Sequence, residues 1–489
     1  MQYLRSKFSV VSLLVLLGLL SGGVCRAGLS GDEQKLLSHI RSQDMMATIE
    51  RLCSKEFRGR KAGSLEECAA ADYIISKFAK DGLSATGADG FVGYKQALTM
   101  NYGLVRTKDD IKASLAYKVH GKGEQTRSFL YRDYNGRGGL DIKSDVVFVG
   151  YGISDPSTGH DDYKGLDVTG KVVIWLSGQP KGVSSKSASG SYKALVAYQH
   201  GAAACLVYRP SNAKDEWGTN VGLAGSIADF PYIAIDDTFA SELLSPISPS
   251  ARSLMSKASD KLPIGAHCLP VELKINPVCD PDRKTFNLIG EIPGSDPLLS
   301  KEIVLVGAHY DHLGDTPDGQ MFAGADDNAS GTSVVLEIAH ALKESGLAPK
   351  RTIVFASWTG EECGLVGSNY FTVHPPFPLS SLAACVNLDM VGEGNTGEFM
   401  TTGKAAYPDR YKTIDGSAED LGYKATADQI RGASDHLAFG RKKVPSFLIY
   451  TAGEHPNYHS VRDVPSAINP TVLESAARLT ALSVWRLAQ

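Results

Sequence analysis

The C-terminal part of the chain, from residue 287 onward, alternates short apolar segments with amphipathic ones, and this alternation restricts the possible folds most strongly. Apolar runs predict strands at 302–308, 352–358, 383–388 and 445–450. Residues 330–344 place Val334, Val335, Ile338 and Leu342 on one face of a helix, and a last helix is predicted from Pro470. Such alternation predicts an α/β domain with a doubly wound, mostly parallel sheet, whose ligands bind beyond the carboxyl ends of the strands.

After the first 27 residues, the chain divides into three parts. Residues 28–140 include two predicted helical stretches between Gly31 and Leu83, and we expect them to form the N-terminal part of the same domain. Residues 141–270 are rich in glycine and short apolar runs and contain no His, Asp and Glu cluster at ligand spacing, which indicates an inserted, β-rich, non-catalytic domain. Residues 271–489 carry the α/β pattern. Such a division suits 489 residues, because single domains rarely exceed about 250–300 residues.

Composition excludes several classes of protein. The chain is 43% hydrophobic and 21% charged, as globular proteins are, and its formal net charge is only −4. No basic stripe or acidic block stands out, so we expect no nucleic-acid partner. The sequence gives no sign of an oligomeric state.

The N-terminus has the pattern of a secretory signal. Arg5 and Lys7 precede an apolar run over 8–20, which is shorter than the roughly 20 residues that a membrane-spanning helix needs. We therefore expect a secreted or periplasmic protein with no stable membrane span. Two ways of processing stay open: cleavage after Ala27, or lipid attachment at Cys25, since residues 20–25 distantly resemble a bacterial lipoprotein signal.

Seven cysteines follow Cys25, and none has the spacing of a zinc finger. In an oxidising compartment the sequence neighbours Cys53 and Cys68, and likewise Cys268 and Cys279, are candidates for disulfides. The odd count leaves buried free thiols as the alternative.

Five potential metal ligands fall at the ends of the predicted strands or in the adjoining loops: His309, Asp326, Glu362, Asp389 and His459. Imidazole and carboxylate groups suit zinc, and this set exceeds what one ion requires. Each residue alone has an ordinary explanation, such as helix capping by Asp326 and Asp327 or a solvated turn at Glu361 and Glu362. Together, at one edge of a sheet, they favour a metal pair about 3.5–4 Å apart that shares a carboxylate and activates a water.

The same region resembles the M28 family of zinc aminopeptidases over about 200 residues. The family's motifs stand here at 308–311, 324–331, 361–368, 387–390 and 458–459, and Ser434-Asp435-His436 is a further similar segment. Residues 58–83 resemble the family's N-terminal part, and the middle block resembles the protease-associated (PA) insert of several subfamilies. The resemblance implies the fold of the zinc peptidases, which is phosphorylase/hydrolase-like.

The resemblance also implies roles for individual residues around two Zn²⁺ ions. Asp326 is expected to bridge the ions, with His309 and Asp389 on one and Glu362 and His459 on the other. Glu361 is expected to be the general base, and Asp311 to orient the imidazole of His309. Tyr458 either donates a hydrogen bond to the oxyanion or packs in the core.

The function implied is that of a metallo-aminopeptidase, which hydrolyses the N-terminal residues of peptides or proteins. Carboxypeptidase-type or dipeptidase-type specificity on the same site is the main alternative. A glutaminyl cyclase uses one zinc and fewer ligands, so the full set of five argues against it. An inactive, receptor-like binding module is disfavoured because Glu361 is retained.

Overall fold

The computed structural model describes residues 28–99, 112–119, 121–128, 130–131, 140–183, 187, 190–208, 210, 220–221, 230–257, 261–276, 284–315, 320–427 and 434–489. The predicted signal segment, with Cys25, lies outside the described residues. Among the described residues, no helix has the length and apolar character that crossing a membrane requires.

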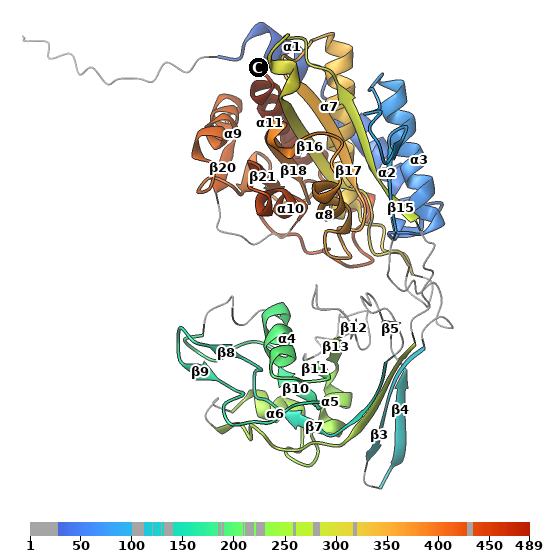
Figure 1. The fold of residues 1–489 in the computed structure, drawn as a ribbon, viewed down its shortest axis with the longest axis vertical. Helices are drawn as coiled ribbons and strands as arrows, with labels where there is room; N and C mark the ends of the chain where they lie inside the picture. The colour runs from blue at the N-terminus through green and yellow to red at the C-terminus, as the bar shows by residue number, and fades with distance from the viewer. Residues whose placement is uncertain are drawn as a thin grey trace, which may run out of the picture.

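A nine-stranded sheet forms the centre of one part of the molecule (Figure 1). Its four central neighbours are parallel: β17 (Thr352–Trp358), β16 (Ile303–His309), β18 (Leu382–Leu388) and β21 (Ser446–Thr451). On one side follow β15 (Lys284–Ile292), β2 (Lys95–Thr99) and β1 (Phe91–Val92), and on the other β19 (Glu398–Thr401) and β20 (Lys424–Ala427).

This sheet is mixed, whereas the sequence predicted a mostly parallel one. Strand β15 is antiparallel to both β17 and β2, and β19 is antiparallel to β21. The chain leaves the sheet along β2 and returns beside it along β15, which makes this pair antiparallel. The parallel pattern therefore holds at the centre of the sheet, where the predicted strands lie.

Helices pack on both faces of the sheet. One core contains Val304 and Val306 of β16 together with residues of α1 (Gly31–Leu37), α2 (Ser42–Leu52), α3 (Leu65–Lys80), α7 (Gly331–Ser345), α9 (Pro408–Leu421) and α11 (Pro470–Leu487). The opposite core contains Ile303 and Leu305 of the same strand, with α8 (Val366–Val373) and α10 (His436–Arg441). Because successive strand residues point to opposite faces, one continuous apolar strand supplies both cores.

The predicted helical stretch near the N-terminus consists of α1, α2, the short 3-10 helix η1 (Arg58–Arg60) and α3. Ser64 caps α3 by accepting the backbone N–H of Glu67. Within η1, Gly59 has φ 71°, and a Cβ there would lie 2.4 Å from the carbonyl oxygen of Phe322, so only glycine fits. Cys53 carries a free thiol, so the disulfide with Cys68 does not form; Cys279 lies outside the described residues.

The inserted segment has two sheets of its own. An antiparallel sheet contains β4 (Gly123–Ser128), β3 (Lys112–Val119), β14 (Val271–Asn276) and β6 (Leu140–Ser144). A parallel sheet contains β13 (Tyr232–Ile235), β11 (Ala204–Tyr208), β10 (Val172–Leu176) and β7 (Val146–Phe148), beside α4 (Gly190–Gln199), α5 (Asp237–Leu243) and α6 (Ala251–Met255). Shorter pairs join β5 (Leu130–Tyr131) to β12 (Asn220–Val221) and β8 (Ser154–Asp155) to β9 (His160–Asp161).

The pairing of β3 with β14 differs from the predicted boundaries at 141 and 270. Residues 112–117 pair with residues 271–276, so this sheet begins well before residue 141 and ends after residue 270. Two strands this far apart in sequence pair only in the folded chain, and the local pattern around 112 does not reveal it. The apolar residues of the segment form two cores that are separate from those of the nine-stranded sheet.

Candidate metal centre

The carboxyl ends of the four central strands carry the predicted ligands. Strand β16 ends at His309, Asp389 directly follows β18, and the loops after β17 and β21 contain Glu362 and His459. Since these four strands are parallel neighbours, their ends lie at one edge of the sheet. The helical turn η4 (Ala325–Ser330), at the start of α7, lies at the same edge.

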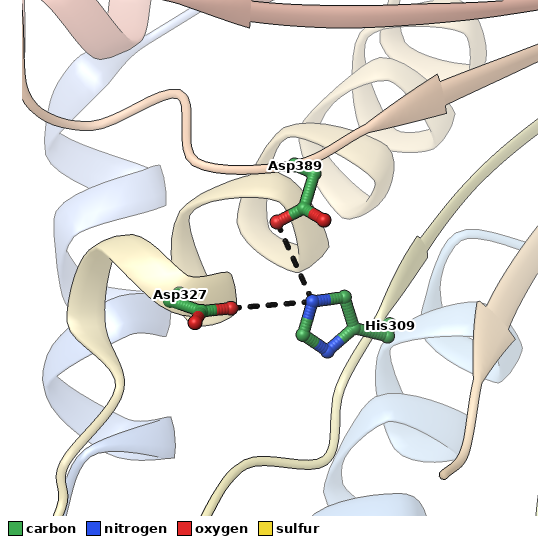
Figure 2. A group of neighbouring side chains, drawn as sticks. All are labelled: His309, Asp327 and Asp389. Atoms are coloured by element: carbon green, nitrogen blue, oxygen red, sulfur yellow. Dashed lines mark ion pairs between the residues drawn. The ribbon is translucent and has the colours of Figure 1, made fainter. Parts of the chain in front are cut away.

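A first group of ligands surrounds the imidazole of His309 (Figure 2). Its Nε2 lies 3.3 Å from Oδ1 of Asp327 and 3.4 Å from Oδ1 of Asp389. The ring is fully buried, and its Nδ1 lies 3.1 Å from the backbone carbonyl oxygen of Asp311. A donor on Nδ1 leaves Nε2 with a lone pair directed toward the two carboxylates.

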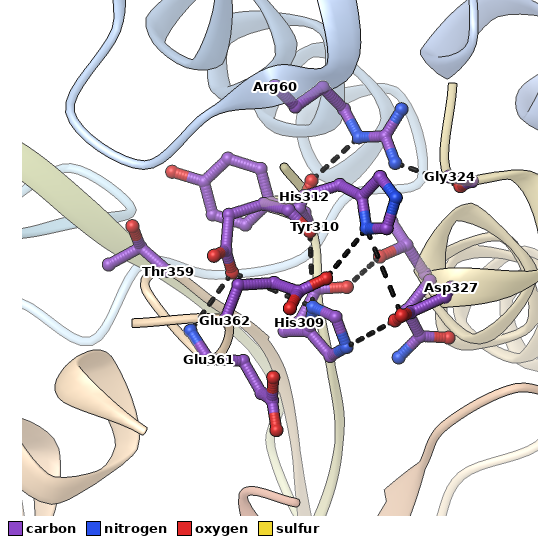
Figure 3. Close-up of polar contacts among 12 residues, drawn as sticks. Arg60, His309, Tyr310, His312, Gly324, Asp327, Thr359, Glu361 and Glu362 are labelled. Atoms are coloured by element: carbon purple, nitrogen blue, oxygen red, sulfur yellow. Dashed lines mark hydrogen bonds and ion pairs between the residues drawn. The ribbon is translucent and has the colours of Figure 1, made fainter. Parts of the chain in front are cut away.

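A second group shares Asp327 with the first. Nε2 of His459 lies 3.0 Å from Oδ2 of Asp327 and 3.1 Å from Oε2 of Glu362. Nδ1 of His312 lies 2.7 Å from Oε1 of Glu362 (Figure 3). The two oxygens of Asp327 therefore face different imidazoles, His309 and His459, and this one carboxylate joins the two groups.

Asp326, which the sequence analysis placed between the two metal positions, points away from both groups, and its neighbour Asp327 lies between them instead. Oδ1 of Asp326 accepts the backbone N–H groups of Gly392 and Glu393 at 2.7 and 3.1 Å, and its Oδ2 lies 2.6 Å from Nδ1 of His455. Adjacent side chains diverge from the backbone, so only one of two neighbouring carboxylates can face the histidines. The carboxylate of Asp463 accepts the N–H groups of both residues, at 2.7 and 3.1 Å, and holds the turn in this orientation.

Glu361 and Glu362 leave the same loop in different directions (Figure 3). The carboxylate of Glu362 contacts two histidines, whereas that of Glu361 belongs to none of the groups of potential ligands among the described residues. The backbone N–H of Glu361 donates to Oδ1 of Asp311 at 3.1 Å. Asp311 therefore contacts His309 mainly through its backbone carbonyl oxygen, which lies 3.1 Å from Nδ1, whereas its Oδ1 lies 3.6 Å from the same atom. Its carboxylate contacts the backbone N–H of Glu361.

Tyr458 lies at the surface of the site. Its side chain is 54% exposed, and its ring stacks on that of His459 with 3.8 Å between centroids. Core packing, one of the two expectations for this residue, does not apply. The exposed phenol, stacked on His459, is accessible to a molecule that enters the site.

Charges shift the pKa values of this cluster in opposite directions. Burial lowers the pKa of His459, but Glu362 and Asp327 outweigh burial and raise it to about 10. Burial raises the pKa of Glu362, but His459 and His312 lower it to about 2. At Glu361 burial raises the pKa well above the ordinary value. The imidazole of His309 opposes this only in part, and the nearby carboxylates of Asp389, Asp435 and Glu362 add to the rise. The two adjacent glutamates thus differ, one being held as a carboxylate and one favouring a bound proton.

The residues present fit metal ions. Among the described residues, buried atoms without a hydrogen-bond partner gather here: Nε2 of His309, both ring nitrogens of His312, Oε1 of Glu362 and Oδ1 of Asp389. Buried polar atoms normally have partners, so a cluster of exceptions calls for an explanation. Imidazole nitrogens and carboxylate oxygens that converge at 3.0–3.4 Å are the donors that zinc prefers.

Two supporting residues were not assigned a role from the sequence. The side chain of Arg60 is fully buried and donates to the carbonyl oxygens of Tyr310 at 2.8 Å, Gly324 at 3.0 Å, Ala323 at 2.9 Å and Leu52 at 2.7 Å. It therefore connects the segment after His309 to the turn before Asp327 (Figure 3). Most arginine side chains lie at the protein surface, so the sequence alone does not indicate a buried role for Arg60. Only its contacts in the folded chain reveal it.

The other supporting residue is Glu67 of α3, which is fully buried. It accepts hydrogen bonds from the backbone N–H of Gly63 and from the hydroxyls of Thr285 and Thr359. Thr359 lies two residues before Glu361 in the chain. Burial raises the pKa of Glu67 to about 8. The N-terminal segment thus contacts the loop that carries both glutamates.

The fold is that of an α/β domain with a mixed sheet. The ends of its central strands carry two linked groups of histidines and carboxylates, as in the metal centres of α/β hydrolytic enzymes. Residues 287–484 match the model of peptidase family M28.

Relatives agree with this assignment. The leupeptin-inactivating enzyme 1 of Streptomyces exfoliatus is 27% identical over 223 residues, which are 41% of this chain and 48% of that protein. A probable leucine aminopeptidase of Arthroderma otae is 30% identical over 212 residues, which are 40% of this chain and 56% of that protein. The chain thus spans about half the length of these relatives. A zinc aminopeptidase from Bacillus subtilis has the same fold, with a TM-score of 0.62 over 91% of this chain and 95% of that one at 22% identity.

Proposed function

We propose that the protein is a dinuclear zinc aminopeptidase in which Asp327 bridges the two ions. The main support for this proposal is the position of Asp327. Its two carboxylate oxygens lie 3.3 and 3.0 Å from the imidazoles of His309 and His459, respectively. Asp389 would complete the first position and Glu362 the second. This assignment keeps four of the five ligands expected from the sequence and replaces Asp326 by its neighbour.

When bound, such an ion pair polarises the scissile carbonyl and makes water acidic enough to attack near neutral pH. Glu361 accepts the proton of the attacking water and passes it to the amine of the leaving peptide. The carboxylate of Glu361 belongs to none of the groups of potential metal ligands among the described residues, which leaves it available to take up this proton. Asp311 keeps Glu361 in place through the backbone hydrogen bond of 3.1 Å.

Tyr458 is proposed to donate its hydroxyl to the oxyanion that forms during attack. Its exposed ring, stacked on His459, supports this role. In Tyr458→Phe we expect zinc content to be unchanged and kcat to fall by about 10²- to 10³-fold, as when one oxyanion donor is lost. Unchanged kcat would remove Tyr458 from the catalytic set.

Cleavage of the N-terminal residue is supported by the relatives, which include a leucine aminopeptidase and a zinc aminopeptidase. The proposed substrates are peptides or proteins with a free N-terminus. The PA-like nature of the insert, the doubly wound topology and export to the periplasm or medium belong to the same proposal. Export is supported by residues 5–27, with cleavage after Ala27 or lipid attachment at Cys25 as the two ways of processing.

Metal analysis of the purified protein, together with a panel of aminoacyl-nitroanilides, tests the proposal. We expect about two zinc ions per chain and hydrolysis of substrates with a free α-amine but not of their N-acetylated forms. N-acetylated dipeptides and N-terminal glutaminyl peptides are the matched controls for carboxypeptidase and cyclase activity. Activity on those controls alone, or no bound metal, would overturn the proposal.

A further inference from the structure

We propose that His312 is a third imidazole ligand of this centre and binds the second metal position through Nδ1, beside His459 and Glu362. The inference rests on the proposed dinuclear function and adds a residue to it. The five ligands expected from the sequence did not include His312.

The position of His312 is the first argument. Its side chain is fully buried at the same edge of the sheet as the other ligands, with Nδ1 2.7 Å from Oε1 of Glu362 and 3.9 Å from Oδ2 of Asp327. Its ring meets that of His459 nearly edge to face, with 5.9 Å between centroids and an angle of 64°. The two imidazoles therefore approach Glu362 on its two different oxygens.

The short contact between Nδ1 of His312 and Oε1 of Glu362 has the geometry of two ligands of one ion. Nδ1 of His312 and Oε1 of Glu362 are both buried without a hydrogen-bond partner among the described residues, although they lie 2.7 Å apart. Their close approach lacks the alignment of a regular hydrogen bond. Ligands of one zinc ion show this arrangement, because bonds of about 2.0–2.1 Å bring donor atoms to roughly 3 Å from each other while each points at the ion.

The chain around His312 holds the ring in this place. The backbone N–H of His312 donates to the carbonyl oxygen of Arg60 at 3.1 Å, which fixes the segment after β16. On the other side lies Gly324, where a Cβ would come within 2.5 Å of Cγ and Cδ2 of the imidazole. Gly324 thus leaves the space that His312 occupies, and its φ of 60° also favours glycine.

The number of ligands is the last argument. With His312 the second position has four protein ligands, Asp327, Glu362, His459 and His312, whereas the first has three, His309, Asp327 and Asp389. Zinc sites with four protein ligands are closed, and sites with three keep a position for water or substrate. The first position would therefore receive the substrate, and the second would chiefly hold the centre together.

Cobalt substitution of the full-length wild-type chain tests the inference without a variant. Each coordinated imidazole keeps one exchangeable N–H, whose proton resonance is strongly shifted by a bound paramagnetic Co²⁺. We expect three such resonances in the protein with two Co²⁺ ions, and two in His312→Gln. Two resonances in a wild-type protein that carries two ions would overturn the inference while leaving the proposed function intact.

Zinc affinity is the second readout, measured by competition with a chelator. We expect His312→Ala to bind the weaker zinc at least about 10-fold less tightly, since lost support of a metal site costs at least this much. His374→Ala is the matched control, because His374 is exposed and stacks on Tyr370 rather than facing the potential metal ligands. Unchanged affinity for both ions in His312→Ala would overturn the inference. A wild-type chain that binds fewer than two ions would instead contradict the proposed function.

Discussion

The carboxylate of Asp311 accepts the backbone N–H of Glu361 at 3.1 Å. Asp311 belongs to the segment after β16, and Glu361 to the loop after β17, so this bond joins the ends of two adjacent strands. It turns Glu362 toward the histidines and leaves the side chain of Glu361 outside the ligand groups. The carboxylate of Glu361 therefore has a position apart from the potential ligands, as the proton-transferring role proposed for it requires.

Asp327→Ala and Asp326→Ala separate the two candidates for the bridging ligand. Asp327 faces His309 and His459, whereas Asp326 faces backbone N–H groups and His455. We expect Asp327→Ala to lose both zinc ions, and Asp326→Ala to retain zinc with reduced stability. Zinc content after dialysis measures this. The reverse result would restore Asp326 as the bridge.

Glu361→Gln should keep both metal ions while kcat falls by at least about 10²-fold, the usual contribution of a general base. The amide is nearly isosteric with the carboxylate but does not accept the proton. Glu362→Gln is the matched control at the adjacent position, and it should lose zinc because Glu362 contacts two histidines. Zinc loss in Glu361→Gln would mean that the two glutamates have exchanged roles.

Arg60→Met should destabilise the metal-free protein by at least about 3 kcal/mol, because four buried carbonyl groups lose their donor at once. Arg58→Met is the control two residues away. Arg58 is 55% exposed and pairs with Asp315, an interaction worth less than about 1 kcal/mol. Urea unfolding measures both. Equal, small effects would show that Arg60 does not support the site.

Glu67→Gln tests a buried carboxyl group by its pH dependence. Folding raises the pKa of Glu67 from 4.5 to about 8, mainly through burial. The folded state therefore binds the extra proton between these values, and the stability this contributes is complete below pH 4.5 and lost as pH rises through 8.

Relative to Glu67→Gln, which stays neutral, the wild-type protein should lose stability between about pH 5 and 8, with no further change above that range. Urea unfolding of the metal-free proteins at several pH values provides the comparison. Parallel stability curves for the two proteins would contradict a raised pKa at this position.

Local sequence pattern predicted which strands carry the candidate site and most of the side chains on them. His309, Glu362, Asp389 and His459 each follow an apolar run, and parallel strands bring their carboxyl ends to one edge whatever the remaining packing is. Local pattern was sufficient because these strands are buried on both faces and continuously apolar.

Tertiary contacts decided the rest. Asp326 and Asp327 are chemically identical neighbours, and the hydrogen bonds of Asp463, 136 residues or more away, decide which of them faces the histidines. Arg60 and His312 have their roles because segments distant in sequence meet around them. The pairing of β3 with β14 likewise sets where the insert begins. Contacts between distant segments leave no periodic signal in the chain, because they depend on where the folded backbone brings each residue.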